Sequence, residues 1–335
     1  MYMFKYILKR IGLMLMCFTV IMLMCFVLIK MLPLNVDGAP SDAKDALLIQ
    51  LEARHYITNL TYNKDGHIDG YDSVPIMTQL GSYVEKIFHG DFGMGVTMPE
   101  YRNKPVLDAF LTRLPPTILI NAYSSLIGVP IGLALGIYAA LKKNKWQDHV
   151  ISTGVIVFIS VPSIVYALLI LYIFCFKLQW FPLRMDAGYD YFSWSMFRSM
   201  MPAVLSLCLG SIAGYARYTR AELTEVLTSE FMLLARTKGL TKGQATVRHA
   251  LRNAMVVIFP SILSEFIAVL SGSLVIEQMF SIPGVGRLYL TAINSKDYDF
   301  FMFLSGFYTL VGLAAGIVTD ISYGIIDPRI RMGAR

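Results

Sequence analysis

Charged residues are scarce in this chain of 335 residues. Only 16% of the residues are Asp, Glu, Lys or Arg and 56% are hydrophobic, whereas about 25% charged residues are usual in a soluble domain. Long stretches carry no charge at all, which excludes intrinsic disorder, a collagen-like repeat and an ordinary soluble α/β enzyme. The composition is typical of a protein that crosses a membrane several times. We therefore attribute the net charge of +6 to membrane orientation rather than to nucleic-acid binding.

Cysteine and the common catalytic motifs are also scarce or missing. All four cysteines lie inside apolar stretches, which argues against a disulfide framework and against a zinc site. The sequence contains no G-x-x-x-x-G-K-[ST] phosphate loop, no H-E-x-x-H motif and no convincing nucleophile constellation. We therefore predict that this chain is not an enzyme and binds no cofactor or metal. If it takes part in ATP-driven transport, another chain must hydrolyse the ATP.

Long apolar stretches, in contrast, are abundant. A bilayer core of about 30 Å requires about 20 mostly apolar residues in each helix. Six stretches meet this requirement: 7–32, 117–141, 150–176, 201–216, 255–276 and 302–325. The first is too long for a signal peptide and lacks a small-residue cleavage site, so we retain it as a membrane helix. The predicted fold class is an all-α polytopic membrane protein with six transmembrane helices.

The distribution of Lys and Arg predicts the orientation of these helices. Segments on the side of the N-terminus carry Lys and Arg at more than twice the density found on the other side. Since positive residues favour the cytoplasmic side, we expect both termini to be cytoplasmic. The longest cytoplasmic connection is then 217–253, and the longest external one is 33–116.

The external segment 33–116 is predicted to contain secondary structure of its own. Leucines between Leu47 and Leu51 favour a helix. Asp65-Gly66 is typical of a hairpin turn. Apolar residues from Ile76 to Ile87 follow helical spacing, and Gly90 is suited to end that helix.

The cytoplasmic segment 217–253 is amphipathic and far longer than a simple connection requires. Apolar residues from Leu223 to Leu234 fall on one helical face, and Gly239 fits a helix C-terminus. Thr241 to Gln244 match a capping box that begins a second helix. A helix, a tight break and a helix suit docking into a groove of a soluble partner. The alternative is a positively charged loop that fixes topology and contacts lipid headgroups.

A carboxylate occurs within the predicted fifth span. Placing a charge at the bilayer centre costs about 2.5–3.5 kcal/mol on insertion scales, so Glu265 should face a cavity or a partner. It either lines a translocation path and meets the amino terminus of a peptide, or is satisfied at an interface with a second subunit. Pro162 and Pro260 kink helices in a way that suits a cavity lining, so both join Glu265 as candidate path residues.

Short motifs in a fixed order carry a family resemblance across more than 200 residues. They are GDFG at 90–93, PV at 105–106, RLPPT at 113–117, WFP at 180–182, ARYTR at 216–220, ARTKGL at 235–240, HALRNA at 249–254, EQMFSIPGVG at 277–286 and DPRIR at 327–331. Together they resemble the permease subunits of binding-protein-dependent ABC importers. The similarity is to the B type of the oligopeptide, dipeptide and nickel branch.

The resemblance implies a type I ABC importer transmembrane domain in a bacterial plasma membrane, with oligopeptides or dipeptides as cargo. It implies as partners a second homologous permease subunit, two ATPase subunits carrying ATP and Mg, an external solute-binding protein, peptide substrate and membrane lipid, but no nucleic acid. The family's ATPase-coupling loop corresponds to residues 230–254, although its usual Glu-Ala-Ala start here reads Leu-Leu-Ala. The implied coupling residues are Glu230, Ala235, Arg236, Lys238, Gly239, Thr241, Gln244, His249 and Arg252. The implied binding-protein face contains Glu277, Pro283, Gly284 and Gly286.

The predicted organisation has three regions. Residues 1–32 form the cytoplasmic N-terminus and first helix, 33–116 the external subdomain, and 117–335 a five-helix permease core. Within the external subdomain, about 41–80 look like material additional to the family pattern. A nickel chelate or glutathione is an alternative cargo. The alternative functions are an ion- or proton-coupled secondary transporter with Glu265 as relay, and a multi-pass enzyme acting on lipid-linked substrates.

Overall fold

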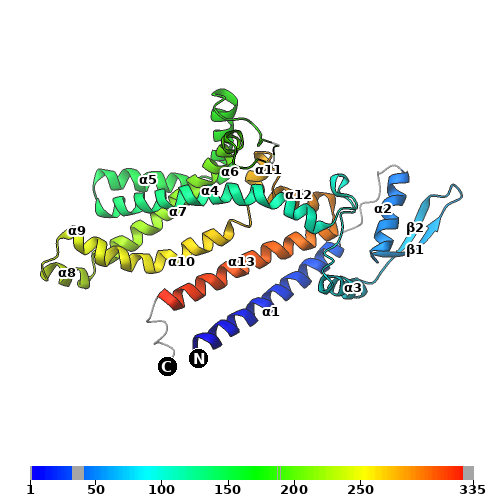
Figure 1. The fold of residues 1–335 in the computed structure, drawn as a ribbon, viewed down its shortest axis with the longest axis horizontal. Helices are drawn as coiled ribbons and strands as arrows, with labels where there is room; N and C mark the ends of the chain where they lie inside the picture. Colours follow the sequence, from blue (N-terminus) through cyan, green and yellow to red (C-terminus); the bar gives the residue numbers. More distant parts are fainter. Residues whose placement is uncertain (1, 32–40, 187, 189, 327–335) are drawn as a thin grey trace. The chain divides into compact units, whose positions relative to one another are not determined.

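The computed structural model describes residues 2–31, 41–186, 188 and 190–326. The chain divides into two compact units. The core unit consists of the beginning of the first helix, residues 114–287 and the chain from 311 onward. The loop unit consists of 12–113 and 288–310. Figure 1 shows that both units are dominated by helices.

The elements follow one another along the chain as shown in Figure 1. Up to the end of the long helix α4 they are α1 (Tyr2–Lys30), α2 (Ser41–Ala53), β1 (Ile57–Tyr62), β2 (Ile68–Ser73), α3 (Ile76–Phe88), η1 (Pro99–Tyr101) and α4 (Val106–Leu141). The next are α5 (Trp146–Ser160), α6 (Ser163–Ile170), η2 (Leu171–Lys177), α7 (Trp194–Leu227), α8 (Glu230–Thr237) and α9 (Lys242–Ala245). The last are η3 (Thr246–Leu251), α10 (Arg252–Ala268), α11 (Leu274–Met279), α12 (Val285–Ser295) and α13 (Tyr298–Ile326).

Five of the described helices are long and apolar enough to cross a membrane, or six spans if a bent pair counts as one. The bent pair joins 146–160 to 163–177 at an angle of 100°. The prediction of one kinked helix over 150–176 therefore underestimates the break. Val161 adopts an extended conformation because Pro162 disfavours helical dihedral angles in the residue before it.

Three other predicted spans differ in their ends. The second, predicted at 117–141, begins earlier, because α4 starts at Val106, inside the predicted external segment 33–116. The fourth, predicted at 201–216, is part of α7, which continues through Arg217 and Arg220 to Leu227. The fifth, predicted at 255–276, ends earlier because α10 stops at Ala268. A turn follows in which Gly272 has φ +67°, a conformation that costs glycine little.

Close contact between α4 and α7 holds the core unit together. A Cβ atom added at Gly132 would lie 2.7 Å from the Cβ of Tyr215, and one at Gly136 would lie 2.6 Å from the Cβ of Thr219. Only glycine permits backbones to approach this closely, as in the small-residue stripes of membrane helices. Gly132 and Gly136 therefore form part of the packing surface between these two helices.

The loop unit contains a small folded subdomain, which confirms the predicted helix, hairpin and second helix. Helix α2 packs against the antiparallel β1–β2 hairpin through a core that includes Leu48, Ile57 and Ile68. The hairpin turns at Gly66, whose φ is +83°. Asp297 accepts hydrogen bonds from the backbone N–H groups of three consecutive residues, 96–98. This buried carboxylate fixes the chain that returns from the subdomain.

Candidate functional site

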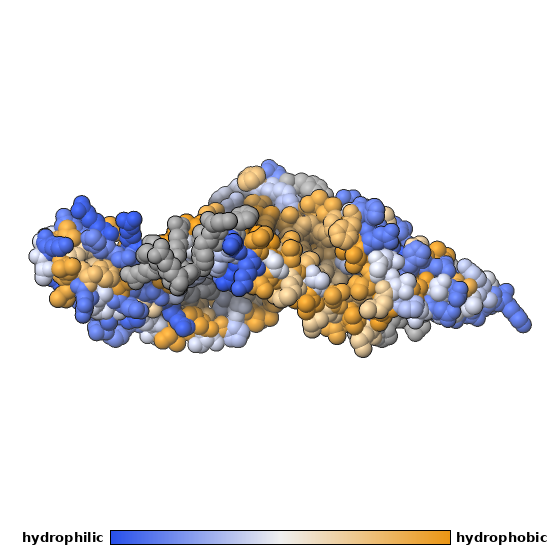
Figure 2. Space-filling model, turned by 90° about the horizontal axis from the view of Figure 1, so that it is seen from below, coloured by the Kyte–Doolittle hydropathy of each residue, from blue (hydrophilic) through white to orange (hydrophobic). Residues whose placement is uncertain are grey.

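The segment 228–251 of the core unit forms the predicted helix, break and helix. Helix α8 ends before Gly239, whose φ of +90° permits the sharp turn. The backbone N–H of Thr241 donates to Oε1 of Gln244 at 3.1 Å, and the N–H of Gln244 donates to Oγ1 of Thr241 at 3.3 Å. These reciprocal bonds confirm the capping box. We call residues 228–251 the coupling segment. Figure 2 shows hydrophilic side chains gathered around this part of the core unit.

The coupling segment has an anchored side and an open side. Met232, Ala235, Ala245 and Ala250 are buried in a cluster with Leu223 of α7. Most of the implied coupling residues are exposed: Glu230, Arg236, Lys238, Gly239, Thr241, Gln244, His249 and Arg252. All of these except Arg252, the first residue of α10, lie in the coupling segment, whereas Ala235 is a buried anchor.

Part of this surface was not predicted from the sequence, and one residue lies on a different face than predicted. Leu234 was expected on the same helical face as Leu223, but it is 56% exposed, whereas Leu223 is fully buried. The helix is interrupted at Thr228-Ser229, and the interruption rotates α8 away from the face of α7. Leu233 is exposed as well. The apolar pair Leu233 and Leu234, close to Arg236 in the sequence, is the signal that could have predicted this exposed side of α8.

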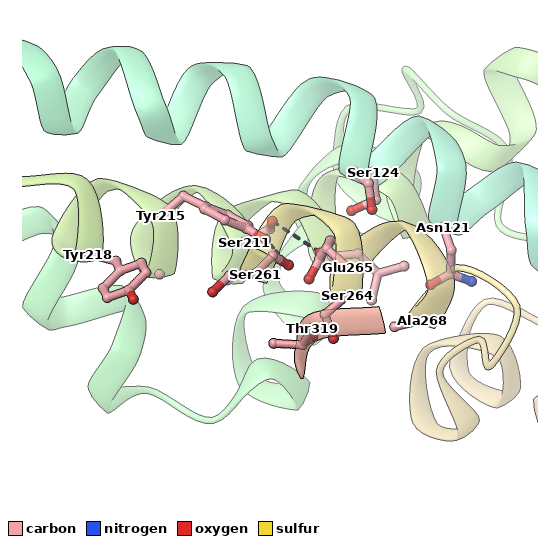
Figure 3. Close-up of a pocket in the computed structure, with 14 residues that line it drawn as sticks. Asn121, Ser124, Ser211, Tyr215, Tyr218, Ser261, Ser264, Glu265, Ala268 and Thr319 are labelled. Atoms are coloured by element: carbon pink, nitrogen blue, oxygen red, sulfur yellow. Dashed lines mark hydrogen bonds between the residues drawn. The ribbon is translucent and has the colours of Figure 1, made fainter. Parts of the chain in front are cut away.

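A second candidate site is a cavity of about 660 Å³ in the core unit. Figure 3 shows side chains from α4, α7, α10 and α13 converging on it. It is lined by Asn121, Ser124, Ser125, Leu207, Gly210, Ser211, Gly214, Tyr215, Tyr218, Ser261, Ser264, Glu265, Ala268 and Thr319. Glu265 is the only charged residue in this lining. We call this space the polar cavity.

The carboxylate of Glu265 retains most of its hydrogen-bonding capacity, whereas other polar groups of the cavity donate within the protein, as Asn121 does to the carbonyl of Thr117 and Thr319 to that of Ala315. Oγ of Ser211 donates to Oε1 of Glu265 over 3.4 Å, a long contact for a hydroxyl donor. The hydroxyl of Tyr215 donates to the carbonyl oxygen of Ser261 at 3.1 Å. An ionised carboxylate has about four acceptor positions, so Glu265 can still receive an ammonium group or water. The cavity is chemically suited to a polar guest with a positive end.

The other two candidate path residues lie elsewhere. Pro162 is exposed at the 100° bend, and Pro260 is buried within α10; neither lines the polar cavity. The hydroxyl residues of the cavity were not predicted. Their sequence signal is the helical spacing of Ser211, Tyr215 and Tyr218 on α7, which places small and polar side chains on one face.

Glu277, in contrast, is enclosed. Its exposed fraction is 1%. Oγ1 of Thr117 donates to its Oε1 at 3.0 Å, and the backbone N–H of Arg287 donates to Oε2 at 3.2 Å. Thr117 in turn accepts from the backbone N–H of Val285 at 2.8 Å. A Cβ atom at either Gly272 or Gly284 would lie 2.3 Å from a carboxylate oxygen of Glu277.

Burial controls the electrostatics of this carboxylate cage, which we define as Glu277, Thr117, Gly272, Gly284 and Arg287. Burial raises the pKa of Glu277 to about 6, although hydrogen bonds from the backbone of Arg287 and from Thr117 oppose the shift. Gly284 and Gly286 are buried as well, and only Pro283 of the four implied docking residues is partly exposed. Binding-protein docking at this turn stays a prediction, and the structure gives Glu277 the role of fixing the turn.

The described part of the chain contains no group of three or more His, Cys, Asp or Glu residues able to hold a metal ion. The described fold and sites are those of a polytopic membrane protein that contains a polar cavity and carries a short helix, α8, between two candidate spans. Residues 132–332 match the family model described as "Binding-protein-dependent transport system inner membrane component". The chain belongs to this family, as the resemblance implied, and is a transport permease.

Relatives extend the match over nearly the whole chain. The "Dipeptide transport system permease protein DppB" of Lactococcus lactis is 32% identical over 330 residues, which cover 98% of this chain and 100% of the relative. The "Oligopeptide transport system permease protein OppB" of Escherichia coli is 32% identical over 77% of this chain and 81% of its own length. A crystal structure of "an amino acid ABC transporter with histidines" covers 65% of this chain and 94% of its own, with TM-score 0.50 and 17% identity. That likeness confirms the ABC importer permease fold.

Proposed function

We propose that this chain is a permease subunit of an ATP-driven importer for dipeptides or oligopeptides. The observation that carries the proposal is the polar cavity with its single carboxylate, in a chain related over 98% of its length to a dipeptide permease. Membrane-level cavities lined by helices are where transporters bind substrate. The permease would expose this cavity alternately to the two sides of the membrane.

The cargo hypothesis follows from the charges of the cavity. Glu265 would receive the amino terminus of a peptide, since a charge-assisted hydrogen bond stabilises the ammonium. Among the described residues, no Lys or Arg lines the cavity to receive a peptide carboxylate, so that group would meet water or a second permease subunit. Glutathione carries one more carboxylate than a simple peptide, and the cavity is correspondingly less suited to it.

The partners of the proposal are those of the family. A second permease subunit would complete the pathway, two ATPase subunits would bind ATP and Mg, and an external solute-binding protein would deliver cargo. The coupling segment would dock in a groove of one ATPase subunit through the exposed residues of α8 and α9. This chain would perform no covalent chemistry and carry no cofactor, and both termini would be cytoplasmic.

Gly239→Pro tests the coupling assignment. Proline fixes φ near −65°, which is incompatible with the φ of +90° at this position, so the break between α8 and α9 must rearrange. In proteoliposomes containing the complete importer, we expect loss of uptake and of cargo-stimulated ATP hydrolysis, with normal amounts of the chain in the membrane. Gly243→Ala is the matched control, because Gly243 has no positive φ and its Cβ would meet nothing within 4 Å. Normal uptake by Gly239→Pro would refute the assignment.

Gentle-detergent purification of the tagged chain tests the assembly. Mass spectrometry should identify a second six-span subunit and ATPase subunits. A solitary chain that transports without ATP would replace the importer by a secondary transporter, with Glu265 as its ion or proton relay.

A further inference from the structure

A groove between α5 and α7 lies apart from the polar cavity and from the coupling segment. It has a volume of about 430 Å³ and is lined by Ile151, Ser152, Val155, Ile156, Ile159, Ser160, Ala216, Arg217, Arg220 and Ala221. The α5 wall is predominantly apolar, and Ile156 is 62% exposed. Both helices belong to segments that are long and apolar enough to cross a membrane, so the apolar part of this groove is suited to face lipid.

The two arginines of the groove differ in their partners. Arg220 forms two hydrogen bonds with the buried carboxylate of Asp148, Nε to Oδ1 at 2.5 Å and Nη2 to Oδ2 at 2.8 Å. Arg217 lies about one helical turn earlier and forms no ion pair or hydrogen bond with any residue that the structure describes, and it is exposed. Because an arginine at the edge of a membrane span is stabilised by a nearby anion, the guanidinium of Arg217 is available to bind one from outside the described chain.

We propose that this groove binds an anionic phospholipid from the leaflet on the side of α8 and α9. One acyl chain would lie against Val155, Ile156 and Ile159, and the headgroup phosphate would bind the guanidinium of Arg217. An apolar groove that ends at an unpaired guanidinium complements a molecule that carries an acyl chain next to a phosphate. The planar guanidinium can also donate two parallel hydrogen bonds to phosphate oxygens.

The depth of the site fits a headgroup. Helix α5 begins at Trp146, which is 70% exposed. Exposed tryptophan at the end of a span is typical of the membrane interface. Ser152 is less than two helical turns further along α5, and a long arginine side chain can reach from that level toward the interface. This inference does not depend on the cargo or on the ATPase partners proposed above.

The test compares lipid binding to purified full-length chain, with whatever subunits accompany it, by native mass spectrometry after titration with phosphatidylglycerol or phosphatidylcholine. The wild-type chain should bind phosphatidylglycerol more tightly. Arg217→Gln should weaken phosphatidylglycerol binding roughly fivefold, the effect expected for one cation near the headgroups, and should leave phosphatidylcholine binding unchanged. Arg217→Lys should retain the preference in part.

Two control variants test whether the loss of lipid binding is specific to the groove. Arg236→Gln removes an exposed cation of α8 that does not line the groove and should leave lipid binding unchanged. Ser160→Trp should fill the groove from its exposed rim and weaken the binding of both lipids. Equal phosphatidylglycerol binding by wild type and Arg217→Gln would overturn the proposal. Disulfide cross-linking of Ile156→Cys to a second permease subunit would also overturn it, because protein rather than lipid would then cover the groove.

Discussion

Two glutamates on neighbouring helices of the core unit have opposite surroundings. Glu265 faces an open cavity and has one long hydrogen bond, whereas Glu277 is buried and accepts from Thr117 and from the backbone of Arg287. A carboxylate whose acceptor positions are occupied by the protein fixes the local chain. A carboxylate with vacant acceptor positions can bind a guest. The number of internal hydrogen-bond donors, rather than membrane depth, therefore separates the structural acid from the candidate substrate contact.

Removal of the enclosed carboxylate should give the largest effect. Glu277→Ala leaves Thr117 and the Arg287 N–H without their acceptor and opens a void, so the free energy of unfolding should fall by about 3 kcal/mol. Reversible unfolding in mixed detergent micelles measures this change. Glu265→Ala is the matched control, since its carboxylate has only the long contact with Ser211. If both variants lost the same free energy of unfolding, the two glutamates would not differ in their structural role.

Crowding of the carboxylate cage should have the next largest effect. Gly284→Ala would place a Cβ atom 2.3 Å from Oε2 of Glu277 and 2.5 Å from Oγ1 of Thr117. Overpacking of this kind costs roughly 2–3 kcal/mol of unfolding free energy. Gly214→Ala is the control in the polar cavity, because a Cβ there meets nothing within 4 Å. If the glycine at 214 proved the more sensitive of the two, the cage would not be the rigid site.

The pH dependence of stability should also differ between the two glutamates. Since burial raises the pKa of Glu277 to about 6 from its ordinary value of 4.5, the folded state binds the proton more tightly than the unfolded state does. The free energy of unfolding should therefore fall as pH rises from about 4.5 to 6, by about 2 kcal/mol, and stay level above that range. Glu277→Gln should remove this decline, whereas Glu265→Gln should preserve it. A decline that persists in Glu277→Gln would assign it to another group.

Much of the fold could be predicted from local sequence signals. The capping box of Thr241 and Gln244 and the hairpin turn at Gly66 were predicted because the signal lies within a few residues. The ends of the membrane spans were not predicted correctly, because hydropathy reflects the preference of a residue for lipid rather than the limits of a helix. Helix α7 continues past Arg220 since that arginine has a partner, Asp148, far away in sequence.

The sites show the same limit. Sequence analysis singled out Glu265 from its charge, but the serines and tyrosines around it come from four helices, and only packing brings them together. Glu277 was assigned to an external surface through the resemblance. Its burial depends on Thr117, which is far from it in sequence, and on glycines that leave room for its carboxylate. Polar residues in long-range contact therefore require a structure.

The smallest effect on stability, and the sharpest test of function, is expected for Glu265→Gln. The free energy of unfolding should change by less than about 0.5 kcal/mol, because the replaced oxygen has no strong internal donor. Uptake of a dipeptide with a free amino terminus should fall about tenfold, since one charge-assisted hydrogen bond is weakened.

The same variant with an N-acetylated dipeptide separates cargo contact from a structural effect. Acetylation removes the ammonium, so wild-type uptake should fall and Glu265→Gln should add no further loss. That non-additivity is the signature of a direct pair. Independent, multiplying losses would instead assign Glu265 to an interface with a second subunit. In that case Glu265, like Glu277, would accept its hydrogen bonds from protein. The two glutamates would then differ only in whether the hydrogen-bond donors belong to this chain or to a second subunit.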